Sequence, residues 1–246
     1  MAGGFGIFDG VGIELQSGLE GVRKRIAMAA AISGRTAGDV KLVAVSKTHP
    51  SEVIRDAITA GVTAFGENKV QEAESKIFEI GRAAAEWHLI GHLQSNKVRK
   101  AVQLFDVIHS VDSVELAERL ERICLEEGRE KLSVLVQVDL AGEAAKSGVS
   151  VHDLQALVEF LKNCERLKFD GLMILPPFFD DPDESRPFFQ HLRKIRDELN
   201  SQDAFANGEG ELSMGMSNDF QEAIEEGATI VRVGTAIFGE RVVDGK

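Results

Sequence analysis

Several features that would assign a chain to a particular class are scarce or absent here. Only two cysteines, Cys124 and Cys164, occur in 246 residues, and neither is part of a CxxC pair. We therefore expect no disulfide framework and a reducing compartment, with the cytoplasm as the default. No apolar run approaches the roughly 20 residues of a membrane span. Because no basic segment precedes an apolar stretch near Met1, we also expect no signal peptide.

An excess of positive charge is also missing. The chain has 28 basic and 40 acidic residues, which gives a net charge of −12. This balance argues against nonspecific binding to nucleic acid and to anionic membranes. It leaves room for a small phosphorylated ligand, because local backbone amides and dipoles can hold a phosphate inside an acidic protein.

What the sequence does contain is a regular alternation of short apolar runs with helical patterns. Each of eight such runs is followed by a helical stretch, with no break in composition between the units. This alternation predicts an α/β fold, a single (β/α)₈ TIM barrel covering residues 1–246; a doubly wound open sheet is the alternative. The expected strands are 41–46, 62–65, 86–90, 105–109, 132–138, 169–175, 211–214 and 229–233.

An additional helix is expected before the first strand. Apolar residues recur at spacings of three and four over residues 11–32, which predicts a helix outside the strand–helix repeat, capping its end. Residues 1–10 are rich in glycine, and we expect them to be flexible. Further along, Asp112 with Glu115 has the spacing of a capping box that opens a helix.

Lys47 lies at the end of the first buried strand, where Pro50 favours the start of a helix. Strand-to-helix junctions are where α/β proteins build their sites. A lysine among apolar neighbours loses hydration, so its pKa falls and the neutral amine can attack an aldehyde. The alternative is a lysine at the rim of the barrel whose amine bends out to water.

The loops after the last two strands are the usual phosphate-binding position in a barrel. If Asn218 caps the following helix, paired with Gln221, then Ser217 keeps a free hydroxyl beside the helix N-terminus, where an anion is favoured. Gly234 allows close approach of a ligand, and Thr235 offers an N–H and a hydroxyl. In the alternative interpretation, Ser217 is itself the cap and Gly234 only turns the chain.

An amine on the first strand and an anion cradle after the seventh and eighth would flank one cavity. A ligand that needs both is a phosphorylated aldehyde, of which pyridoxal phosphate is the obvious candidate. Arg232, at the end of the last strand, can only donate hydrogen bonds. Facing the pyridine nitrogen, it would keep that nitrogen unprotonated; the alternative is a salt bridge on the barrel wall.

The chain resembles the pyridoxal phosphate homeostasis protein family in motifs spread in order over about residues 41–240. The matching motifs are VAVSK at 43–47, FGENxVQE at 65–72, WHLIGHLQSNK at 87–97, HSVDS at 109–113, KSG at 146–148, GLM at 171–173, LSMGMSxD at 212–219, and AIxxGxTxVRxGTAIFG at 223–239. The chain departs from the family pattern at Lys69, where an aromatic residue is common, and around Pro176-Pro177.

The resemblance implies a barrel similar to the N-terminal domain of alanine racemase, a monomer, and pyridoxal 5′-phosphate as the cofactor. It assigns the Schiff base to Lys47, the phosphate to Ser217 with the amides of Gly234 and Thr235, and the pyridine nitrogen to Arg232. Three further residues match motif positions that should lie near the cofactor: Asn68, His92 and Met214. Lys146 matches a family lysine that is considered a second aldehyde-handling site.

The sequence contains no tyrosine. Related two-domain racemases place a lysine and a tyrosine on opposite faces of the substrate, so a replacement base would have to be a histidine such as His92 or His109. We therefore expect a non-catalytic protein that binds pyridoxal phosphate and buffers or delivers it, with apo-enzymes that require the cofactor as its partners. The alternatives are a one-domain racemase-like or transaminase-like enzyme and, from another class, a Schiff-base aldolase.

Overall fold

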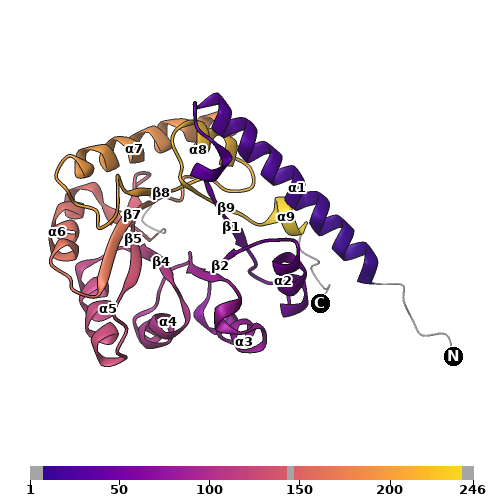
Figure 1. Cartoon of the computed structure of the whole chain (residues 1–246). Helices are drawn as coiled ribbons and strands as arrows, with labels where there is room; N and C mark the ends of the chain where they lie inside the picture. The colour runs from indigo at the N-terminus through magenta and orange to yellow at the C-terminus, as the bar shows by residue number, and fades with distance from the viewer. Residues whose placement is uncertain (1–7, 143–146, 240–246) are drawn as a thin grey trace.

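The computed structural model describes residues 8–142 and 147–239, with side chains from residue 13 onward. Its centre is a closed ring of parallel strands, seen end-on in Figure 1. The eight strands of the ring are β1 (Lys41–Val45), β2 (Ala64–Glu67), β3 (Glu86–Leu89), β4 (Val107–Val111), β5 (Leu132–Asp139), β7 (Leu167–Met173), β8 (Glu211–Ser213) and β9 (Ile230–Val233).

The ring closes because the first and last strands pair with each other. β1 pairs with β2 on one side and with β9 on the other, and the remaining strands pair in chain order, with β4 joined to β5. The two-residue strand β6 (Val149–Ser150) pairs with the end of β5 outside the ring. All of these pairings are parallel, so the carboxyl ends of the strands share one face, and the expected (β/α)₈ barrel is confirmed.

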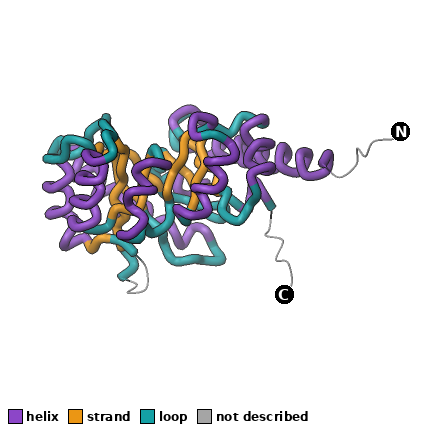
Figure 2. The backbone as a smooth tube through the Cα atoms, turned by 90° about the horizontal axis from the view of Figure 1, so that it is seen from below, coloured by secondary structure: helices purple, strands orange, loops and turns teal. Residues whose placement is uncertain are grey.

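Helices cover the outside of the strands, and Figure 2 shows them flanking the strands at the centre. The α-helices are α1 (Phe8–Ile32), α2 (Ser51–Thr59), α3 (Val70–Ile80), α4 (Val98–Leu104), α5 (Val114–Glu126), α6 (Val151–Lys162), α7 (Arg186–Asn200), α8 (Phe220–Glu225) and α9 (Thr235–Phe238). Short 3₁₀ turns are η1 (Ala37–Asp39), η2 (Arg82–Ala84), η3 (Ser95–Lys97) and η4 (Pro182–Ser185). Within the described residues, no helix is both long and apolar enough to span a bilayer.

The additional N-terminal helix is present as α1, which lies along the outside of the barrel beside α8 and α9 (Figure 1). It begins at Phe8, so residues 8–10 are helical and the expected flexible start is wrong for them; residues 1–7 lie outside the described residues. A Cβ added at Gly18 would come within 2.7 Å of the carbonyl oxygen of Ile237. The missing side chain therefore allows α1 to contact α9 closely.

The core has two layers. The larger layer lies between strands and helices and includes Phe65 and the single tryptophan, Trp87, whose rings are 5.6 Å apart. A smaller apolar cluster, which includes Val43 and Met173, fills the barrel interior. Trp87 is fully buried. Strands buried on both faces explain why their sequences are continuous apolar runs rather than alternating ones.

Three expected strands start two residues away from their predicted positions. β7 starts earlier, at Leu167, whereas β2 and β4 start later, in both cases where a helix end continues into the predicted strand. The N–H of Val62 still bonds the carbonyl of Ala57 at the end of α2, so β2 starts at Ala64 instead of Val62. Likewise the N–H of Phe105 bonds Ala101, and β4 starts at Val107. Apolar character alone cannot separate these helix-end residues from the strands that follow.

The Asp112 capping box is also wrong. The helix α5 is capped by Ser113, whose hydroxyl accepts the N–H of Leu116. The acidic residue within its first turn is Glu115. Asp112 lies just outside the helix, where burial raises the pKa of its carboxyl group.

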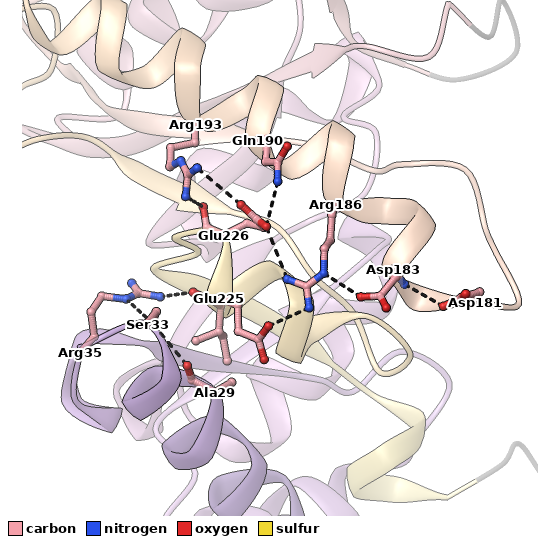
Figure 3. Close-up of polar contacts among 11 residues, drawn as sticks. Ala29, Ser33, Arg35, Asp181, Asp183, Arg186, Gln190, Arg193, Glu225 and Glu226 are labelled. Carbon is pink, nitrogen blue, oxygen red and sulfur yellow. Dashed lines mark hydrogen bonds and ion pairs between the residues drawn. The ribbon is translucent and has the colours of Figure 1, made fainter.

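Two arginines, one after α1 and one at the start of α7, bind α8 through hydrogen bonds and ion pairs, as Figure 3 shows. Arg35, which follows α1, donates to the carbonyls of Ile224 at 2.5 Å and Ala228 at 2.9 Å. Arg186, at the start of α7, reaches Glu225 at 2.7 Å and Glu226 at 3.4 Å (Figure 3). These contacts hold the helix that connects β8 to β9.

We predict that Arg186→Ala lowers the free energy of unfolding by about 1–2 kcal/mol, because several charge-assisted hydrogen bonds in a partly buried network are lost together. Urea unfolding followed by circular dichroism measures the change. Arg119→Ala, at an exposed position of α5, is the matched control and should stay within about 0.5 kcal/mol. Equal stability of the two variants would contradict a structural role for Arg186.

Candidate functional site

A cavity of about 580 Å³ opens at the carboxyl ends of the strands. This volume lies within the range of about 300–1,000 Å³ that is usual for small-molecule sites. Its wall combines apolar side chains with a few polar groups. The lining residues are Val45, Lys47, His49, Asn68, Ile90, Gly91, His92, Gln137, Ser147, Leu175, Phe178, Met216, Ser217, Asn218, Arg232, Gly234, Thr235 and Gly239.

Lys47 lies on the cavity wall, two residues beyond the end of β1, and its side chain is half-buried. The next residue, Thr48, has a φ of +69°, a left-handed conformation that costs energy for a β-branched residue. A strained backbone beside a half-buried lysine persists only where the surroundings enforce it. The enforcing contacts come from α3.

A buried ion-pair cluster from β2 and α3 holds both neighbours of Lys47. The ammonium of Lys76 donates to the carbonyl of Ser46 at 2.8 Å and to carboxylate oxygens of Glu67 and Glu72, each at 2.7 Å. Glu72 accepts the N–H of Thr48 and Glu67 accepts the hydroxyl of Ser46, so both sides of the lysine are fixed.

The two carboxyl groups of this cluster are shifted in opposite directions. Burial is the largest effect on Glu67 and raises its pKa, against the opposing attraction of Lys76. For Glu72, burial is again the largest single effect and acts upward. The hydrogen bonds from Lys76 and from the Thr48 N–H outweigh it, and the pKa is lowered. Glu67 is therefore the carboxylate that depends most on Lys76 to stay ionised.

The loops after β8 and β9 meet at Ser217. Its hydroxyl oxygen accepts the N–H of Gly234 at 3.2 Å and that of Ala236 at 3.4 Å. Two backbone donors and a hydroxyl thus converge at the start of α9, beside the exposed Thr235. This donor set suits an anion such as a phosphate.

The cap of the preceding helix differs from both interpretations of the sequence. The residue at the N-cap of α8 is Asp219, whose carboxylate accepts the N–H of Met216 at 2.7 Å. Asn218 instead donates to the carbonyl of Phe179 at 3.1 Å. The predicted Asn218 cap is wrong, and so is the alternative of a Ser217 cap. The hydroxyl of Ser217 is turned toward the loop after β9 instead.

Arg232 is almost completely buried, with 2% of its surface exposed, and lines the cavity from β9. It donates to the hydroxyl of Ser213 at 2.6 Å and to the carbonyl of Ile174 at 2.8 Å. Both partners are uncharged, so these contacts are not the wall salt bridge of the alternative interpretation. Burial lowers its pKa to about 10, which leaves the guanidinium protonated at neutral pH.

The remaining predicted residues divide into three groups. Asn68 and His92 line the cavity, and a ring nitrogen of His92 lies 3.1 Å from the hydroxyl of Ser147. Met214 is fully buried in the core layer between strands and helices and is not among the lining residues. Lys146 lies outside the described residues.

His109 is not at the cavity mouth, so it is no candidate for a base there. Both of its ring nitrogens are engaged inside the barrel, by His88 at 2.8 Å and Ser213 at 2.9 Å. Burial, the largest cause, and the adjacent His88 lower the pKa of His109 well below its ordinary value. Of the two histidines proposed as replacement bases, only His92 lines the cavity.

Three contributors escaped the sequence analysis. His49 lines the cavity and stacks on Phe238, with ring centroids 4.9 Å apart. Gln137 lines it from β5 and donates to the carbonyl of Ser147. The third is the amide of Ala236. The polar Gln137, which directly follows the apolar residues 134–136 of β5, was a visible signal, whereas no sequence pattern marks the amide of an alanine.

Comparison with known proteins places these features in a family. Residues 22–242 match the family model described as alanine racemase, N-terminal domain. The chain is 42% identical over 223 residues to the pyridoxal phosphate homeostasis protein of Aquifex aeolicus, covering 91% of this chain and 96% of that one. The protein of the same name from Pseudomonas aeruginosa is 43% identical over 220 residues, covering 89% and 93%.

Solved structures give the same result. PipY of Synechococcus elongatus, solved with PLP bound, superposes with a TM-score of 0.76 at 43% identity and covers 87% of this chain and 100% of that chain. Alanine racemase from Corynebacterium glutamicum has a TM-score of 0.63 at 18% identity, over 93% of this chain and 62% of its own length. At that identity the likeness shows a shared fold alone.

Proposed function

The chain belongs to the pyridoxal phosphate homeostasis protein family, and from this premise we propose that it binds pyridoxal 5′-phosphate and holds it for delivery to other proteins. The observation that carries the proposal is the shared cavity. Lys47, Ser217 with the Gly234 N–H that it accepts, and Arg232 all belong to one cavity wall.

The residues present fit this cofactor. A phosphate suits the Ser217 hydroxyl with the amides of Gly234 and Thr235, which line the cavity together, because oriented donors compensate its charge. The N–H of Ala236, which donates to Ser217, lies beside them. The amine of Lys47 would hold the aldehyde carbon as a Schiff base, with loss of water. The apolar part of the wall, which includes Val45 and Ile90, suits an aromatic ring.

The protein's own groups favour holding the cofactor over using it. When bound, pyridoxal phosphate supplies an electron sink whose strength depends on a protonated ring nitrogen. Arg232 stays protonated and only donates, so it would leave that nitrogen without a proton. The chain has no tyrosine to serve as a second base, and both nitrogens of His109 are engaged. We therefore propose a carrier rather than a racemase-like enzyme.

The location, the oligomeric state and the partners of the protein follow from the same premise. We propose a cytoplasmic monomer whose partners are apo-enzymes that require pyridoxal phosphate. Two unpaired cysteines, Cys124 and Cys164, suit a reducing compartment. The exposed Phe178 at the edge of the cavity is an apolar group that such a partner would meet first.

The test combines binding with transfer. Purified protein mixed with pyridoxal phosphate should develop a visible Schiff-base absorption band. Borohydride should fix one cofactor to the peptide that contains Lys47, detected by mass spectrometry. The loaded protein should then activate an apo-transaminase.

Incubation with a panel of L-amino acids in deuterated solvent separates the carrier from an enzyme. We expect no turnover of the α-proton. Exchange over many turnovers would overturn the carrier interpretation. A protein that develops no visible band and retains no pyridoxal phosphate in equilibrium dialysis would overturn binding itself.

A further inference from the structure

A chain of buried polar groups runs through the barrel interior beneath Arg232. The guanidinium lies 2.6 Å from the hydroxyl of Ser213, which lies 2.9 Å from Nδ1 of His109. Nε2 of His109 is 2.8 Å from Nδ1 of His88. Ser213, His109 and His88 are each fully buried, and the barrel interior also holds an apolar cluster that includes Val43 and Met173.

The chemistry of Arg232 sets the direction of the hydrogen bonds. An arginine can only donate, so the oxygen of Ser213 accepts from Arg232. Among the described residues, Nδ1 of His109 is the other hydrogen-bond partner of this buried hydroxyl, so the hydrogen of Ser213 is directed to it. That Nδ1 then carries no proton, and a neutral His109 must carry its proton on Nε2. This proton in turn points to Nδ1 of His88, whose own proton is placed on Nε2.

The chain ends at the opposite face of the barrel from the cavity. Nε2 of His88 lies 3.5 Å from a carboxylate oxygen of Glu86, the first residue of β3. This distance is too long for a good hydrogen bond, so the Nε2–H dipole of His88 interacts with the carboxylate charge of Glu86 only electrostatically. The same carboxylate accepts Lys41 at 2.9 Å. The His88 imidazole first, and Lys41 after it, lower the pKa of Glu86 to about 2, so it is ionised at neutral pH.

We propose that Ser213, His109 and His88 are positioning residues that form a one-way hydrogen-bond chain from Arg232 to Glu86. The chain fixes the orientation of the guanidinium at the cavity and extends its charge toward the carboxylate. The direction of these hydrogen bonds is fixed. Reversing it would require both histidines to change tautomer and Ser213 to donate to Arg232, which cannot accept a hydrogen bond. This inference rests on the proposed function for the role of Arg232, whereas the hydrogen-bond direction itself does not depend on it.

The charged and titratable groups around His109 support a neutral imidazole. His88, Arg232 and Lys41 each disfavour a second proton on His109, in addition to burial. A cationic His109 would also turn Nδ1 into a donor toward Ser213, whose hydrogen would lose its acceptor. The chain therefore requires one protonation state of His109 as well as one tautomer.

Long-range proton–nitrogen NMR correlations on the wild-type protein test the direction, with and without pyridoxal phosphate. At neutral pH, each histidine should carry its proton on Nε2 and none on Nδ1. A proton on Nδ1 of His109, or a cationic ring, would overturn the proposal. This measurement does not require the cofactor, so it separates failure of the chain from failure of the proposed function.

The functional consequence is tested with Ser213→Ala. We expect about tenfold weaker binding of pyridoxal phosphate and a displaced pH titration of its visible band, with both properties restored in Ser213→Thr. Ser133→Ala is the matched control, because Ser133 is also on a barrel strand but bonds Asp170 at 2.6 Å instead. A Ser213→Ala protein with wild-type affinity and an unchanged titration would overturn the positioning role, and if this variant does not fold, the tautomer measurement decides.

Discussion

Lys47→Ala is expected to abolish the visible Schiff-base band and to leave nothing for borohydride to fix. The variant retains the donors around Ser217 and Arg232, so weak noncovalent binding of pyridoxal phosphate should remain. We expect its affinity to fall at least about a hundredfold, which corresponds to about 2.8 kcal/mol. Absorption spectra and equilibrium dialysis measure the two effects separately.

Lys69→Ala is the matched control for this loss. Lys69 is an exposed lysine next to Asn68, so it shares the charge and the region of Lys47 without lining the cavity. It should keep the full band and change the affinity less than about threefold, as expected for a screened surface charge. An unchanged yellow band in Lys47→Ala would remove this residue from its assigned role.

Lys76→Met should cost more folding stability than any other substitution discussed above, about 3–5 kcal/mol in the free energy of unfolding. The variant leaves the fully buried carboxylate of Glu67 without its cation and the carbonyl of Ser46 without its donor. Guanidinium unfolding measures the loss. Weaker binding of pyridoxal phosphate should accompany it, because the contacts on either side of Lys47 loosen.

The matched control is Lys100→Met. The ammonium of Lys100 also pairs with a carboxylate, that of Glu74 at 2.6 Å, but both side chains are about half exposed, at 53% and 43%. We expect a change within about 1 kcal/mol, as is usual for exposed pairs. If the two methionine variants were equally stable, the buried cluster would have no special structural role.

The cost of Lys76→Met should depend on pH. The pKa of Glu67 is raised in the folded protein, so the folded state holds this proton more tightly than the unfolded state does. Removing Lys76 raises that pKa further. The destabilisation should therefore be largest above the further raised pKa of Glu67 in the variant, and it should shrink as the pH falls through that value toward the folded pKa of Glu67 in the parent protein.

A double-mutant cycle would assign this effect to the pair. Adding Glu67→Gln to Lys76→Met removes the unpaired charge, so the double variant should recover a large part of the lost stability at neutral pH. Strictly additive losses would contradict a direct interaction of Lys76 with Glu67.

Much of the fold followed from the sequence because parallel strands buried on both faces are continuous apolar runs between helical stretches. The closure of the barrel was expected from the number of such runs, and the pairing of β1 with β9 confirms it. The boundaries at Val62 and Phe105 were less predictable, because an apolar residue at a helix end resembles the first residue of a strand.

The site was predictable where a residue's chemistry is unusual for its place in the chain. A lysine and an arginine at strand ends stood out, and the structure brings Lys47 and Arg232 to one cavity. Caps were harder to assign, because Asn218 and Asp219 are adjacent and only packing decides which one turns inward. Contacts such as that of Lys76 with Ser46 join residues 30 positions apart, and helical periodicity does not indicate them.

The absence of tyrosine and the full burial of Trp87 have an optical consequence. Intrinsic ultraviolet emission of this protein arises from one indole, on β3 beside Phe65, in the layer that joins strands to helices. Emission therefore monitors the barrel wall, while the visible band of a bound cofactor monitors the rim. If both signals are recorded during denaturation, they would show whether the cavity at the strand ends unfolds before the strand–helix layer around Trp87. A single probe cannot resolve this kind of local unfolding.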